Sequence, residues 1–171
     1  MDQPIENKVA RSGLVTIDLE AWYPAGERVL FDIKDLLWQE IALKEKDFRT
    51  FVKAHDWAQY QGKLVALHCS VDAIVPTWAF MLLATALAPY AQDVVFGNLE
   101  QLERSLYQRI IDGIDGADYQ DQRVVIKGCS DREVPADAYV ALTRKLQPFA
   151  RSIMYGEPCS TVPLYKRPRN T

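Results

Sequence analysis

The sequence predicts an α/β protein, in which a parallel four-stranded sheet is flanked by helices and preceded by a small N-terminal α+β segment. From Lys63 onward, short apolar runs rich in β-branched residues alternate with segments of helical periodicity, and this alternation is typical of parallel sheets. An apolar fraction of 49% beside 25% charged residues is ordinary for a globular protein. We therefore expect residues 1–60 to form the N-terminal segment and residues 61–171 to form the core.

The N-terminal segment has two β-rich runs, residues 14–17 and 29–33, separated by a turn at residues 24–26. The apolar residues of 35–43 suit either a short helix or another strand. Residues 47–54 carry their apolar side chains on one side, which predicts a helix.

The core repeats a strand-then-helix pattern. The predicted elements are strand 64–67, helix 76–88, strand 94–96, helix 98–111, strand 124–126, helix 135–146 and strand 152–155. Pro76 suits the first position of its helix, because a proline there loses no helical hydrogen bond. Asn98 and Gln101 have the spacing of a capping box, which places a helix start at this point.

One short phrase occurs three times in the chain. Each of the three cysteines, Cys69, Cys129 and Cys159, is followed by serine and, within a few residues, by Val-Pro. The first two copies also share a β-rich run before the cysteine and the same apolar positions after the proline, with one residue of gap between them. Repeated strand-and-helix architecture explains part of this similarity, but it does not require the cysteines.

The predicted strand order brings the three thiols to one edge. In a short doubly wound sheet of order 2-1-3-4, the first, third and fourth strands are neighbours, and their carboxyl ends precede the three cysteines. Strands lie about 4.8 Å apart, so the thiols would span roughly 10 Å. Several thiolates close together favour a soft cation, which predicts zinc or an iron–sulfur cluster. The predicted ligands are Cys69, Cys129 and Cys159, with Asp72, Asp131 or Glu157 as the fourth.

Other interpretations of the same residues stay open. The cysteines could be inert packing residues or exposed reactive thiols, because no pair has CxxC spacing. An enzyme of unknown class would use the crevice at the switch point of the sheet for a small substrate. A structural or interaction module would bind a partner through a tryptophan-rich face near Trp22 or Trp38.

Charge and hydropathy exclude two classes of partner. A net charge of -3 and a pI near 5.4 argue against binding to nucleic acid. The longest apolar stretch, residues 79–89, is too short to span a membrane. The polar start at residues 1–4 lacks the apolar core of a secretion signal, so we expect a soluble cytoplasmic protein; a homo-oligomer is left open.

Three phrases together are distinctive: Ser12 to Leu19, Ile74 to Ala79, and Ser152 to Ser160. With them the chain resembles, over essentially its whole length, a family of bacterial proteins called domain of unknown function 2480. The family has no established activity, so the resemblance implies no catalytic residues. Its genes tend to lie near those for sulfur mobilisation and iron–sulfur assembly. The resemblance therefore implies a role in cluster assembly or sulfur handling, with iron–sulfur assembly proteins as partners.

Overall fold

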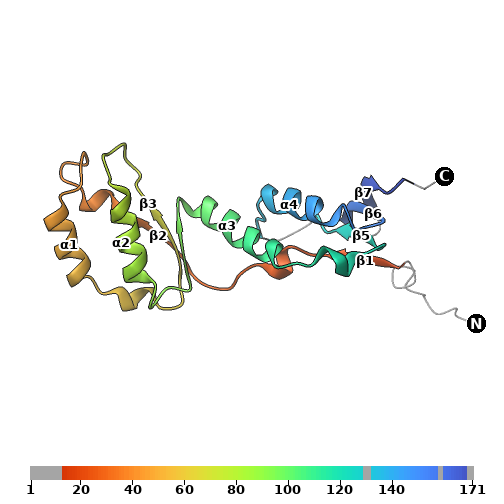
Figure 1. The fold of residues 1–171 in the computed structure, drawn as a ribbon, viewed down its shortest axis with the longest axis horizontal. Coiled ribbons are helices and arrows are strands. Elements are labelled where there is room, and N and C mark those ends of the chain that lie inside the picture. The colour runs from red at the N-terminus through yellow and green to blue at the C-terminus, as the bar shows by residue number, and fades with distance from the viewer. Residues whose placement is uncertain (1–12, 129–131, 158–159, 169–171) are drawn as a thin grey trace, which may run out of the picture. The chain divides into compact units, whose positions relative to one another are not determined.

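The computed structural model describes residues 13–128, 132–157 and 160–168, which form two compact units (Figure 1). Unit 1 combines the first part of the chain, up to Tyr23, with the part from Tyr107 onward. Unit 2 is the stretch between them, Pro24–Leu106. The second boundary falls inside one helix, α3 (Leu99–Asp112), whose two halves contribute side chains to different cores.

Unit 2 contains a three-stranded parallel sheet. Its order is β2-β3-β4, made of β2 (Arg28–Asp32), β3 (Leu64–His68) and β4 (Asp93–Phe96). The central strand β3 is an uninterrupted apolar run, as expected for a parallel strand that is covered on both faces.

Two helices cover one face of this sheet: α1 (Glu45–Ala54) and α2 (Thr77–Leu87). Ala79, Leu83 and Leu87 repeat every four residues along α2, so they share one side of the helix and are fully buried. They form one cluster with alternate residues of β3, Val65 and Leu67.

The first half of α3 covers the opposite face. Leu102 and Leu106 pack with the remaining alternate residues of β3, Leu64 and Ala66. This half of the helix also carries Glu103, whose carboxylate forms an ion pair of 2.6 Å with Arg28 of β2.

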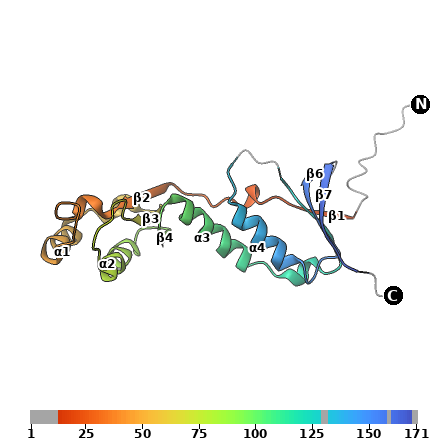
Figure 2. The same cartoon turned by 90° about the horizontal axis from the view of Figure 1, so that it is seen from above.

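Unit 1 has a mixed four-stranded sheet of order β1-β5-β6-β7. Its last two strands, β6 and β7, lie side by side (Figure 2). The strands are β1 (Leu14–Ile17), β5 (Arg123–Ile126), β6 (Ser152–Glu157) and β7 (Ser160–Lys166). The first three are parallel, whereas β7 runs antiparallel to β6.

Helix α4 (Ala136–Leu146) packs on this sheet. Its fully buried Leu142 and Leu146 meet Val124 and Ile126 of β5. Four short 3₁₀ helices complete the two units: η1 (Glu20–Trp22), η2 (Ile33–Leu36), η3 (Trp57–Tyr60) and η4 (Gly116–Tyr119).

Most predicted elements are confirmed, with ends displaced by a few residues. The capping box is present: the Asn98 amide donates to Gln101 Oε1 at 2.8 Å, and the Gln101 amide donates to Asn98 Oδ1 at 2.9 Å. None of the described helices is both long and apolar enough to cross a membrane.

The predicted single parallel sheet of four strands is wrong. Strands β3 and β4 are neighbours, as are β5 and β6, but β3 and β5 belong to different sheets. The two N-terminal strands account for the difference, because β2 pairs along β3 and β1 pairs along β5. The prediction placed β3 and β5 next to each other. In the structure β2 lies beside β3 instead, and β1 lies beside β5.

The two units repeat one structural plan, as the sequence similarity suggested. The sequence offset that relates Pro76 to Pro135 also relates η3 to η4, β3 to β5, α2 to α4 and β4 to β6. Asp56 and Asp115 begin the two 3₁₀ helices in the same way, each accepting a hydrogen bond from the amide two residues later.

Backbone details support the same equivalence. The Gly62 amide donates to Tyr90 O at 2.9 Å, and at the matching place the Asp121 amide donates to Phe149 O at 3.0 Å. Gly97, directly after β4, and Gly156, near the end of β6, both have a positive φ, 134° and 122°, a conformation that side chains rarely permit. Only β7 lacks a counterpart among the described strands of unit 2.

Candidate functional site

The strands that precede the three predicted thiols belong to two different sheets. Cys69 follows β3 in unit 2, whereas β5 and β6, the strands that precede Cys129 and Cys159, belong to unit 1. Cys129, Cys159 and Asp131 lie outside the described residues. The geometric reason for expecting three thiols at one sheet edge is therefore removed.

The remaining predicted ligands do not assemble within the described ranges. Cys69 is half-buried, and its thiol donates to Val71 O at 3.3 Å. Asp72 is exposed in the same loop, while Glu157 ends β6 in unit 1. Over residues 13–128, 132–157 and 160–168, no three histidine, cysteine or carboxylate side chains are grouped closely enough to hold a metal ion.

A polar cluster occupies the carboxyl edge of the unit 1 sheet. The register pairs Ile17 with Ile126, so the next residues, Asp18 and Lys127, leave their strands side by side. Lys127 Nζ lies 2.9 Å from Asp18 Oδ2, and this hydrogen bond is the main reason that the pKa of Asp18 is lowered. The Asp18 partner likewise raises the pKa of Lys127, with a smaller contribution from the charge of Glu157. Glu157 Oε1 is shielded from solvent and meets no hydrogen-bond donor within the described part of the chain.

Unit 2 has an equivalent aspartate at the same edge. Asp32 ends β2 and accepts hydrogen bonds from the amides of Lys34 at 3.0 Å and Ser70 at 3.1 Å. Burial alone would raise the pKa of Asp32, but the hydrogen bonds from Ser70 and Lys34 outweigh it, so the pKa is lowered. His68 occupies the position of Lys127. Each sheet edge thus carries an aspartate whose pKa is lowered by the hydrogen bonds that it accepts.

We expect the stabilising effect of Asp18 to depend on pH. Because its folded-state pKa is lowered, its contribution is present above the ordinary carboxyl pKa of 3.8 and is lost as the pH falls through the folded value. Asp18→Asn should therefore be less stable than wild type at pH 7, and the two should converge in acid. Urea unfolding from pH 7 to pH 2.5 measures this. A stability difference that stays constant over the range would contradict the assignment.

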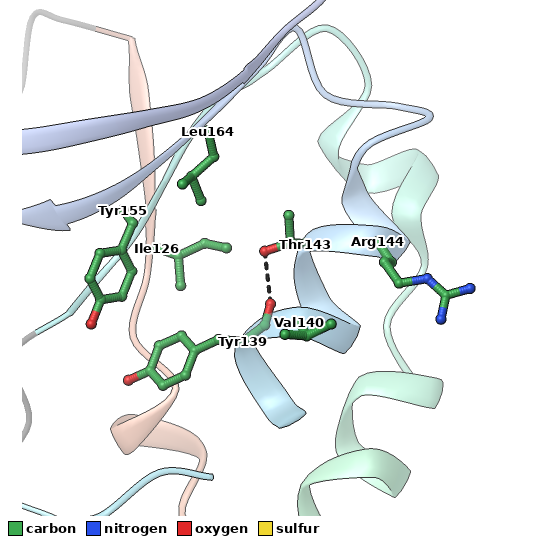
Figure 3. Close-up of a pocket in the computed structure, with 7 residues that line it drawn as sticks. All are labelled: Ile126, Tyr139, Val140, Thr143, Arg144, Tyr155 and Leu164. Carbon is green, nitrogen blue, oxygen red and sulfur yellow. Dashed lines mark hydrogen bonds between the residues drawn. The ribbon is translucent and has the colours of Figure 1, made fainter. Parts of the chain in front are cut away.

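An apolar groove lies beside the sheet of unit 1 (Figure 3). It has a volume of about 340 Å³ and lies between α4, the ends of β5 and β6, and β7. Tyr139 of α4 and Tyr155 of β6 meet edge to face, with ring centroids 5.7 Å apart. Leu164 of β7 forms one wall of the groove (Figure 3).

Leu164 is directed there by a β-bulge. Ile153 of β6 pairs with Tyr165, and Met154 pairs with Pro163, so Leu164 has no opposite residue on β6. A bulge of this kind redirects a side chain at the edge of a sheet. Strand β7 thus supplies one wall of the unit 1 groove, which stays open to solvent at Val140.

Unit 2 has an apolar groove at the equivalent place. Its volume is about 510 Å³, and Phe80 of α2 meets Phe96 of β4 edge to face at 4.9 Å between centroids. Met81 and Ala84 of α2 line it together with Val94 of β4. No described strand lies on the outer side of β4.

The two grooves differ in the exposure and in the identity of their matching side chains. Phe96 is 67% exposed, whereas its counterpart Tyr155 is 37% exposed. At matching positions the unit 2 groove has phenylalanines in place of the two tyrosines, and Ala84 in place of Thr143. Large exposed apolar side chains gathered beside a groove, here Phe96 and Met81, mark a candidate binding surface.

The sequence prediction missed both grooves. The signal that could have found them is the internal repeat, since Phe80 and Phe96 match Tyr139 and Tyr155 at a constant offset.

The profile of one protein family matches residues 3–167 of the chain. Its description is "Protein of unknown function (DUF2480)". The chain matches no curated protein and no solved structure. Because the matched segment spans nearly the whole sequence, the protein belongs to the DUF2480 family.

Proposed function

We propose that the protein is a binding protein that recognises a partner protein through the groove of unit 2. The observation that carries this proposal is the contrast between the two equivalent grooves. In unit 1 Leu164 of β7 supplies one wall of the groove, whereas no described strand lies beside the groove of unit 2, on the outer side of β4. Covering Phe96 and Met81, which are 67% and 63% exposed, would remove apolar surface from water and supply a driving force for association.

A photocrosslinking experiment in the native cells tests this function. The photoreactive residue p-benzoylphenylalanine is placed at Met81, inside the groove, and separately at Ile41, which is 53% exposed in unit 2 but does not line the groove. We expect a discrete protein adduct from position 81 only. Adding Phe96→Lys should abolish that adduct, because a charge would then lie in the groove.

Mass spectrometry of the adduct identifies the crosslinked protein and its crosslinked segment. The same adducts from positions 41 and 81, or none from position 81, would contradict the proposed binding role.

A second candidate is the predicted zinc or iron–sulfur site, serving cluster assembly or sulfur handling. The observation that favours it is Glu157, whose shielded Oε1 meets no hydrogen-bond donor within the described residues and which stands two positions before Cys159. A cation near this end of β6 would compensate the carboxylate. Cys69 follows β3, a strand of the other sheet.

Metal analysis tests the second candidate. Protein purified without oxygen should contain stoichiometric zinc, or iron and sulfide with visible absorption, and Cys159→Ala should lose it. Metal-free protein whose Cys→Ala variants fold like wild type would rule the candidate out.

A further inference from the structure

We infer that the groove of unit 2 binds an extended peptide strand, which adds antiparallel to the outer edge of β4 and places an apolar side chain in the groove beside Phe96. The inference rests on the proposed binding function and specifies its ligand: a segment of a partner protein whose chemistry resembles that of β7. Strand addition of this kind gains affinity from main-chain hydrogen bonds and specificity from side-chain pockets.

The protein itself contains the template for this arrangement. In unit 1, β7 pairs with β6 from Ser152 to Glu157, and β6 is the counterpart of β4. An edge strand presents backbone N–H and C=O groups along its outer side, and these groups are a template for another strand. The sheet of unit 2 ends at β4, so its outer edge offers at the equivalent place what β6 offers to β7.

The groove provides a place for the anchoring side chain. Leu164 forms a wall of the unit 1 groove, and no described strand supplies a counterpart beside the unit 2 groove. The greater volume in unit 2, about 510 Å³ against about 340 Å³, is consistent with this missing wall. A leucine-sized side chain entering there would cover Phe96 and Met81.

Charge specifies the other end of the bound strand. In unit 1, Lys166 of β7 lies opposite Ser152. The residue at that position in unit 2 is Asp93, the first residue of β4. A basic residue in the bound strand, two positions after its apolar anchor as in β7, would therefore face a carboxylate.

A synthetic peptide with the sequence of residues 160–168 provides a direct probe. It carries fluorescein, and its anisotropy is followed as the full-length protein is added. We expect saturable binding of one peptide per chain. Phe96→Lys should weaken binding at least about tenfold, while the matched control Ile41→Lys should leave it unchanged.

Changes in the peptide test the anchor and the charge separately. Leu164→Asp in the peptide should weaken binding about as much as Phe96→Lys in the protein. Lys166→Glu in the peptide should weaken binding several-fold, and Asp93→Lys in the protein should restore it. This rescue cannot arise from a loss of folding.

The following outcomes would overturn the inference. Peptide binding could be absent, or it could be insensitive to both Phe96→Lys and the Leu164→Asp change. Alternatively, sedimentation could show a wild-type dimer that Phe96→Lys dissociates, in which case a second copy occupies the groove. A groove-specific photocrosslink to a helical segment would keep the proposed binding function and refute the strand. Loss of both the peptide binding and the photocrosslink would refute the function as well.

Discussion

Leu83→Ala and Leu142→Ala should each destabilise the protein by about 2–5 kcal/mol, the usual cost of emptying a well-packed leucine site. The two leucines occupy equivalent positions on α2 and α4, and both are fully buried. Each belongs to a different hydrophobic cluster, one in unit 2 and the other in unit 1. We therefore expect each substitution to act chiefly on its own unit.

Urea unfolding gives the total effect of these substitutions, and amide hydrogen exchange assigns it to a unit. Leu83→Ala should accelerate exchange most in β3, and Leu142→Ala most in β5. Met81→Ala and Val140→Ala are matched controls on exposed positions of the same helices and should change stability by less than about 0.5 kcal/mol. Equal acceleration in both units by either leucine substitution would contradict the assignment of two separate cores.

Removing residues 160–171 should destabilise unit 1 by about 3 kcal/mol or more. The truncation deletes β7. Tyr165 of this strand packs against the unit 1 core, and Leu164 forms one wall of the groove. Burial of one such large side chain contributes roughly 1.5–3 kcal/mol. The ion pair between Arg167 and Asp121 is lost as well.

The truncated chain should also acquire a second peptide site. With β7 absent, the unit 1 groove is open like that of unit 2, so the peptide of residues 160–168 should bind with a stoichiometry of two instead of one. Its addition should restore part of the lost stability of unit 1 by mass action. Unchanged exchange in β5 and β6 after truncation, or a stoichiometry that stays at one, would show that β7 does not cover an equivalent site.

The local elements of this fold could be predicted from sequence, whereas the pairing of the strands could not. The four-residue spacing of Ala79, Leu83 and Leu87 identifies α2, and Asn98 with Gln101 identifies the start of α3. These signals depend on residues close together in the chain. The pairing of β1 with β5 joins residues more than a hundred positions apart, and nothing in the local pattern specifies it.

Strand β7 was missed for a physical reason. Pro163 lies in its middle, and proline counts against a strand assignment because it cannot donate to the ladder. It is tolerated here because β7 is the edge strand of its sheet. Without β7, the two halves of the repeat looked alike. The difference between a groove lined by β7 and a groove with no described strand beside it was therefore not apparent from the sequence.

The three-thiol prediction depended on a strand order that the protein does not have. Within the described residues, Asp18 and Asp32 lie at matching strand ends of the two sheets. The sequence did not indicate that those strand ends belong to two sheets.

Amide exchange at β4 in the presence of the β7-sequence peptide tests the central claim most directly. We predict that saturating peptide slows exchange at residues 94–96 of the wild-type protein and leaves the Phe96→Lys variant unaffected. Unchanged exchange at β4, or slowing confined to β6 in unit 1, would contradict the claim that the second unit receives a strand from a partner.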